Sequence, residues 1–225
     1  MKKENVLSNK EKTREMTILA MFIAIIALLG LVPAPWGTTW GFFRIVGTIE
    51  ATIIHIPVLI GAALMGKRFG IYLGLAFGII SNIAAFIYGS PFFYYPWVAI
   101  LPRFIFGFII VYVVNLSLKI FPTKSIAIFI SFFVLSLIHT IITLTMLYTV
   151  FPMLLELPFN LETFEYFLFT WIFLIGFPWV QLLEALAAGL IGSVIVIRLA
   201  KDFGIKKYMT KTEIEMLDFE ENEVS

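Results

Sequence analysis

The main candidates for chemistry in this 225-residue chain are six polar side chains inside long apolar stretches: His55, Asn82, Arg103, His139, Gln181 and Glu184. An arginine keeps its proton in proteins, so Arg103 in such a setting must meet an anion. That anion is either Glu184, in a structural ion pair, or the carboxylate or phosphate of a ligand. The sequence leaves both possibilities open, and each histidine could be a satisfied structural residue as readily as a ligand contact.

Several other kinds of chemistry are excluded. The chain has no cysteine, which excludes disulfides, thiolate metal sites and cysteine nucleophiles. The two histidines stand on separate stretches without a nearby carboxylate, so we expect no metal site. No aspartate lies in an apolar stretch, so a Ser-His-Asp triad is not expected. Gly61 to Lys67 matches the start of a phosphate-binding loop, but Arg68 replaces the Ser or Thr that should follow. We therefore expect neither an enzyme nor a protein that hydrolyses ATP itself.

The composition is that of an integral membrane protein. Hydrophobic residues make up 60% of the chain and charged residues 14%, and the mean hydropathy is +0.98. About 20 apolar residues cross the hydrocarbon core of a bilayer as a helix. Six stretches approach or exceed this length, at about 15–33, 51–66, 69–88, 96–119, 125–150 and 167–199. The sequence thus predicts an all-α bundle of six transmembrane helices, the first of them retained because it is too long for a signal-peptide core.

Charge predicts the orientation of this bundle. With a cytoplasmic N-terminus, all basic residues except Arg44 and Arg103 fall on the inner side, which is 14 of the 16. Both termini are then cytoplasmic, with segments 1–14 and 201–225 flanking a membrane domain at 15–200. This predicts a multi-pass protein of the cell membrane. The basic residues are spread among loops, so no nucleic-acid partner is expected.

The expected outer loops, at 34–50, 89–95 and 151–166, differ in character. The first two are aromatic, with Trp36, Trp40 and Phe43 in one and Tyr94 and Tyr95 in the other. They form either an aromatic belt at the lipid headgroups or lids over a cavity mouth. The third loop is acidic, and we expect it to be only solvated. Since the polar groups of the second, third and fourth stretches fall in the outer half of the bundle, we expect a cavity open to the outside.

Small residues predict where helices pack closely. Gly66, Gly70, Gly74 and Gly78 recur every fourth residue, and Ala185, Gly189 and Ser193 make a similar row. We expect both rows to pack inside the bundle. Ala20 and Ala24 form a comparable face on the first helix. Because that helix is expected at the periphery, this face could equally contact another protein.

With its six stretches in place, the chain resembles the substrate-binding (S) component of energy-coupling factor (ECF) vitamin transporters over most of residues 15–200. The resemblance rests on Ala20-x-x-x-Ala24, on I-H-I-P-V-L-I-G-A-A-L-M-G-K-R-F-G followed by L-G-L-A-F-G, on I-L-P-R-F-I-F-G around Arg103, and on V-Q-L-L-E-A-L-A-A around Glu184. Among the subfamilies it looks most like the pantothenate type; the riboflavin, folate and pyridoxine types fit less well. Lys67 stands directly after Gly66, where many relatives have a proline.

The resemblance implies a substrate-capture subunit of an ATP-driven importer. Such a subunit binds a vitamin from outside under lids, here the stretches around Trp36–Phe43 and Ser90–Trp97. It docks on a transmembrane coupling subunit through Ala20 and Ala24, and two ATPase subunits use the ATP, so the chain needs no cofactor of its own.

For pantothenate, Arg103 would neutralise the ligand carboxylate. The residues expected to line the rest of the binding site are His55, Asn82, Trp97, His139, Trp171, Gln181 and Glu184, with the two tryptophans as apolar walls. Two alternative interpretations compete with a vitamin-binding subunit. A lipid-modifying enzyme would need converging His, Asp or Glu at the membrane surface, and a stand-alone channel or secondary transporter often shows inverted repeats, which we do not find convincingly here.

Overall fold

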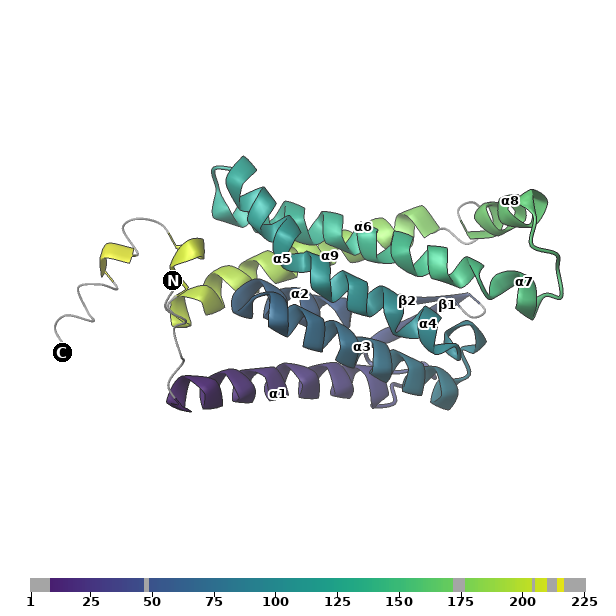
Figure 1. The fold of residues 1–225 in the computed structure, drawn as a ribbon, viewed down its shortest axis with the longest axis horizontal. Coiled ribbons are helices and arrows are strands. Elements are labelled where there is room, and N and C mark those ends of the chain that lie inside the picture. The colour runs from purple at the N-terminus through teal and green to yellow at the C-terminus, as the bar shows by residue number, and fades with distance from the viewer. Residues whose placement is uncertain (1–8, 47–48, 172–176, 204, 210–213, 217–225) are drawn as a thin grey trace, which may run out of the picture.

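The structure is a computed structural model that describes residues 9–46, 49–171, 177–203, 205–209 and 214–216 (Figure 1). Its helices and strands follow one another in the order α1 (Asn9–Leu31), β1 (Phe42–Val46), β2 (Ile49–Thr52), α2 (His55–Met65), α3 (Lys67–Tyr88), η1 (Pro91–Phe93), α4 (Pro96–Ala99), α5 (Leu101–Ile120), α6 (Lys124–Tyr148), α7 (Phe151–Leu154), α8 (Leu161–Phe169), α9 (Phe177–Asp202) and η3 (Lys206–Tyr208).

The helical membrane bundle is confirmed, although its second span is unusual. In the described part of the chain, five helices are long and apolar enough to cross a membrane: α1, α3, α4 with α5, α6 and α9. Helix α2, which stands where the second of six spans was expected, has only 11 residues and is about 16 Å long, so the count of six spans stays a prediction. The first residues of the expected second span form strand β2 instead. Because α2 packs between α1, α3, α5 and α9 and is almost wholly buried, it does not need to match the thickness of the lipid.

The two ends of the bundle carry different elements. Figure 1 places the start of α1, the α5–α6 turn and the end of α9 at one end, and the β-hairpin, α4, α7 and α8 at the other. The first of these we call the basic end, since it carries Arg14, Lys119, Lys124, Arg198 and Lys201. Its assignment to the cytoplasm, and with it the position of both termini, stays a prediction from the positive-inside rule.

Both rows of small residues pack inside the bundle, as expected. A side chain added at Gly70, Gly74 or Gly78 would collide with the backbone of α5 or of the α4–α5 junction, in the case of Gly78 at 2.7 Å from the Cα of Ile100. On α9, a side chain at Gly189 would collide with Phe129 of α6. These close approaches replace the missing hydrophobic driving force between helices in lipid.

Gly66, by contrast, does not belong to the packed row. It lies in the tight α2–α3 turn with a φ of +95°, and an added Cβ would meet nothing within 4 Å. Its role is conformational, because this backbone geometry is strained for residues with a side chain.

Part of the expected charged tail docks on the bundle. Tyr208 and Met209 are buried, and the Tyr208 hydroxyl donates a 2.6 Å hydrogen bond to the carbonyl of Ala63. Ala63 lies in the last turn of α2, where helix carbonyls lack partners within the helix. This cap was not predicted from the sequence, since Tyr208 directly follows two charged residues, Lys206 and Lys207.

The outer loops hold two structured elements that were not predicted. Strands β1 and β2 pair antiparallel, with Phe42 opposite Thr52 and Arg44 opposite Glu50. The acidic third loop is also not merely solvated, which corrects our expectation. It contains α7 and most of α8, and α8 ends at Phe169, inside the stretch expected as the sixth span. Phe151 of the loop and Phe167 just after it are buried in a cluster with Val98 and Trp171. The hydrophobic effect anchors this loop, while its glutamates remain outside.

Candidate functional site

Arg103 is buried near the start of α5, toward the end of the bundle that carries the β-hairpin, α4, α7 and α8. It lies in the first turn of α5, where Pro102 is tolerated because the first helical residues need no backbone donor. Its side chain is 3% exposed, and Nη1 donates a 2.9 Å hydrogen bond to the carbonyl of Val98. The guanidinium lies 4.9 Å from the ring centre of Phe93 and 5.4 Å from that of Phe77. These contacts hold the charge in place without neutralising it.

The ion pair between Arg103 and Glu184, one of the two alternatives left open by the sequence, is not seen between these two residues, both of which the structure describes. Oε1 of Glu184 instead accepts a 2.7 Å hydrogen bond from the backbone N–H of Thr52. This bond ties α9 to the end of β2. The carboxylate whose charge acts on Arg103 is Glu50, also on β2. A strand that the sequence did not predict thus supplies the counter-charge.

Two cavities meet at Arg103. The first, which we call the α6–α9 cavity, contains about 700 Å³ of empty space, a figure that includes the open space at its mouth. Its lining residues come chiefly from α6 and α9: Glu50, Thr52, Phe93, Arg103, His139, Thr140, Thr143, Leu144, Leu147, Trp171, Val180, Gln181 and Glu184.

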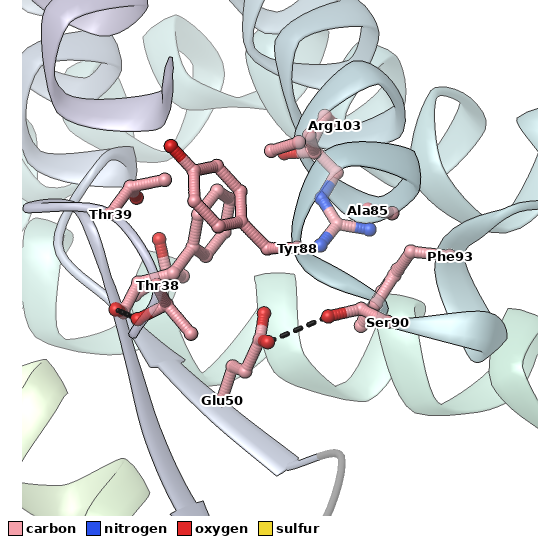
Figure 2. A pocket seen from close by; sticks show the side chains of 12 residues that line it. Thr38, Thr39, Glu50, Ala85, Tyr88, Ser90, Phe93 and Arg103 are labelled. Atoms are coloured by element: carbon pink, nitrogen blue, oxygen red, sulfur yellow. Dashed lines mark hydrogen bonds between the residues drawn. The ribbon is translucent and has the colours of Figure 1, made fainter. Parts of the chain in front are cut away.

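The second cavity, which we call the α3–hairpin cavity, contains about 430 Å³ of empty space including its open mouth and is shown in Figure 2. Its lining residues come from α3, the hairpin, the two aromatic loops and, with Arg103, from α5: Thr38, Thr39, Phe42, Glu50, Thr52, Ser81, Ala84, Ala85, Tyr88, Ser90, Phe93 and Arg103. Glu50, Thr52, Phe93 and Arg103 line both cavities, so a charged pair stands where the two spaces join.

Several buried polar atoms around these cavities have no hydrogen-bond partner within the described residues. They are Nε of Arg103, Nε2 of His139 and Oγ1 of Thr143 on the α6–α9 cavity, and Oγ of Ser81 on the α3–hairpin cavity. Leaving a buried polar group unpaired costs about 1–3 kcal/mol, so native structures rarely keep such groups without a purpose. These four groups leave hydrogen-bonding capacity for a polar ligand or for water around one pair of cavities.

A chain of hydrogen bonds orients one wall of the α6–α9 cavity. The Thr140 hydroxyl donates to Oε1 of Gln181, and Nε2 of Gln181 donates to Oγ of Ser136 at 3.3 Å. Ser136 also lies 3.2 Å from Nε2 of His55. The His55 ring in turn stacks on His139, with ring centres 6.0 Å apart. His55 is not among the lining residues; it contacts one residue that is, His139, and it also contacts Ser136, which holds Gln181.

Five of the eight predicted binding residues line one cavity: Arg103, His139, Trp171, Gln181 and Glu184. Asn82 and Trp97 do not join them. The Asn82 amide donates to the carbonyls of Phe93 and Tyr94, at 2.8 and 3.1 Å, so it fixes the loop that carries Phe93. The Trp97 side chain is 44% exposed and its Nε1 donates to the Thr149 hydroxyl on the outer surface.

The predicted lid aromatics flank the cavities and do not line them. Trp36 stacks on Phe43 and meets Trp40 edge-on, with ring centres 5.1 and 5.0 Å apart. On the second loop, Tyr94 stacks on Phe86 and Tyr95 packs against Trp97. The loop aromatic that contacts both cavities is Phe93, which the sequence did not single out.

Glu50 was also missed, because a single acid in an aromatic loop looks like a solvated residue. A signal for it exists in the sequence. Gly47 and Thr48 separate two short runs rich in β-branched and aromatic residues, a pattern typical of a β-hairpin. A hairpin at this place brings Glu50 back toward the start of α2.

With this geometry in view, comparison with known proteins identifies the class. Residues 14–200 match the family of ECF transporter substrate-specific components, and the chain belongs to that family. It is therefore a multi-pass protein of the cell membrane and a component of a transporter, not an enzyme.

Two curated relatives are more specific. The chain is 37% identical to the pantothenic acid transporter PanT of Lactococcus lactis subsp. cremoris over 82 residues, which are 36% of this chain and 39% of that protein. It is 32% identical to the pantothenate transporter PanT of Leuconostoc mesenteroides subsp. mesenteroides over 106 residues, 45% of this chain and 51% of that protein. The aligned regions thus span about half or less of these relatives.

Proposed function

We propose that this chain is the pantothenate-capturing subunit of an ATP-driven ECF importer. The names of the two relatives supply the vitamin, and Arg103 supplies the chemistry that fits it. Pantothenate carries one carboxylate, one amide and two hydroxyl groups. A guanidinium that is 3% exposed, lines two cavities and has an orphan Nε is suited to the carboxylate. This orphan donor is the observation that carries the proposal.

The remaining polar groups of the α6–α9 cavity would bind the rest of the vitamin. His139 and Thr143 each present an unpaired polar atom, and Gln181 is oriented by Ser136 and Thr140. One oxygen of Glu184 accepts a hydrogen bond from the backbone N–H of Thr52, and its other oxygen would accept one from a ligand hydroxyl. Apolar contact would come from Trp171, as sites of this kind combine apolar walls with a few placed polar groups.

The same proposal includes the partners of the chain. Ala20 and Ala24 are exposed on α1, which lies at the edge of the bundle (Figure 1). A smooth exposed face lets another helix approach closely. This face would dock on the transmembrane coupling subunit, and two ATPase subunits would use the ATP, so the chain itself carries no cofactor.

Binding of labelled pantothenate to the purified protein tests the substrate. We expect saturable binding that is not displaced by riboflavin, folate or pyridoxine, and mass spectrometry of gently purified protein should reveal the retained vitamin. Displacement by one of the other three vitamins would reassign the substrate within the family. The absence of binding to all four would contradict the proposed function.

Co-purification with a coupling module tests the partners. Ala20→Trp should abolish recovery of the coupling subunit while pantothenate affinity is unchanged, because the indole prevents close helix contact. Val194→Trp adds the same bulk at a position on α9 that is 70% exposed and should have no effect. Equal recovery with both variants would remove α1 from the interface.

A further inference from the structure

Glu50 joins two loops that are far apart in sequence. Figure 2 shows its carboxylate on the hairpin side of the α3–hairpin cavity, facing Ser90. The Ser90 hydroxyl donates a 2.6 Å hydrogen bond to Oε1 of Glu50. Ser90 is 3% exposed, and its backbone N–H is bonded to the carbonyl of Ala85 at the end of α3. One end of this contact is therefore fixed to a long helix, and the other lies on the two-stranded hairpin.

The same carboxylate acts on the charge of Arg103. The direct contacts of the guanidinium are with neutral groups, namely the Val98 carbonyl and the rings of Phe77 and Phe93. A buried cation needs a compensating charge, and Glu50 provides a Coulombic attraction from across the cavity. A ligand carboxylate that reaches Arg103 must enter the field of Glu50, which repels it.

We propose that Glu50 is a specificity-determining residue with two linked roles. Through Ser90 it latches the hairpin to the loop after α3, and through its charge it is the counter-ion of Arg103 from across the cavity, against which a ligand carboxylate must compete. The second role rests on the proposed binding of a carboxylate ligand. Together the two roles link the arrival of the ligand's charge to the position of the hairpin over the cavity.

Two variants separate charge from latch. Glu50→Gln keeps an oxygen that accepts from Ser90 but removes the charge, whereas Ser90→Ala removes the hydrogen bond and keeps the charge. The probes are pantothenate and pantothenol, in which an alcohol replaces the carboxylate. We expect Glu50→Gln to bind pantothenate about tenfold more tightly, as the loss of a nearby like charge predicts, with pantothenol changed by less than about twofold.

Ser90→Ala should instead speed the dissociation of both probes by a similar factor. A merely structural Glu50 would give a different result, since Glu50→Gln would then weaken both probes alike. That outcome, or no change in the ratio between the two probes, would overturn the role of charge.

A measurement without ligand tests the latch separately. In hydrogen–deuterium exchange, Ser90→Ala and Glu50→Ala should each raise exchange of amides in Phe42–Val46 and Ile49–Thr52 several-fold. Thr149→Val is the matched control, because it removes another hydroxyl contact at the same end of the bundle, the one to Trp97. Raised exchange in a protein that binds no pantothenate would refute the proposed function and keep the latch. Unchanged exchange in a protein that binds it would refute the latch alone.

Discussion

The α3–α5 seam and the α6–α9 cavity lie side by side in one bundle, yet they are built on opposite principles. At the seam, Gly70 and Gly107 bring two backbones into direct contact and leave no space for even a methyl group. Around the cavity, His139 and Thr143 stand on α6 with buried atoms that have no partner within the described chain. The two helices of the seam fill each other's surface completely, whereas the cavity leaves buried polar atoms of the described residues without a hydrogen-bond partner.

The contrast shows how the closely packed α3–α5 seam can position a binding group for the neighbouring cavity. A side chain added at Gly74 would strike the carbonyl of Arg103, so the seam fixes the backbone that carries the guanidinium. The guanidinium itself reaches into the cavity, where loops and the hairpin surround it. Precise placement of a binding group needs support of this kind from packed elements.

The largest effect should follow from removing the charge of the cavity. Arg103→Met keeps much of the volume but removes every donor, and we expect pantothenate affinity to fall by more than about 100-fold, as for the loss of a buried charge pair. Arg103→Lys keeps a charge without the planar fork and should lose about tenfold. Equilibrium binding to the purified variants measures both.

Pantothenol is the control for this prediction, since it has no carboxylate for Arg103 to bind. Its affinity should fall far less in both variants. If wild-type affinity for pantothenate survives Arg103→Met, the guanidinium is not the carboxylate site and the cavity has another purpose.

A substitution in the α3–α5 seam should lower the stability of the protein. Gly74→Ala forces a methyl group against the α5 backbone, and overpacking of this kind costs about 1–3 kcal/mol. We expect a lower midpoint of thermal unfolding in detergent, together with weaker binding because Arg103 moves. Leu75→Phe adds volume at the next residue, which is exposed, and should leave both quantities unchanged.

The seam was predictable from sequence, and much of the cavity was not. Glycines at every fourth residue report directly on close helix contact, so Gly70, Gly74 and Gly78 indicated their own role. A charge such as Arg103 in an apolar stretch also indicates function, because the cost of burying it is high.

The cavity depends on contacts between loops, which no periodicity reveals. Glu50 acquires its role because strand β2 pairs with β1, and Phe93 because Asn82 holds its loop by two hydrogen bonds. Asn82 and Trp97 had the right chemistry for a ligand, but depth along a helix does not say which way a side chain points. The same limit applies to Glu184, whose partner proved to be a backbone amide of β2.

A smaller effect is expected at Thr143, where one substitution should weaken binding without lowering stability. Its buried hydroxyl is an orphan, so Thr143→Val removes an unpaired polar group at nearly constant shape. We expect the free protein to be equally or slightly more stable, while pantothenate affinity falls about fivefold to tenfold for the lost hydrogen bond. Thr145→Val is the control, since that exposed hydroxyl bonds only to its own helix at Ile141. A loss of stability in Thr143→Val would show that the hydroxyl is satisfied in solution.

The smallest effect is expected at the basic end, where Tyr208 caps α2. Tyr208→Phe should cost about 1 kcal/mol of unfolding free energy without changing affinity, because the hydroxyl is remote from the cavity.

Burial raises the pKa of the Tyr208 phenol above its ordinary value of about 10. The folded state therefore holds this proton more tightly than the unfolded state, and the stabilisation is complete below pH 10 and declines above it. Tyr166→Phe, at a position 55% exposed on α8, should match wild type. If Tyr208→Phe declines with pH as steeply as wild type, the cap does not contribute to stability, and the basic end is held by apolar packing alone.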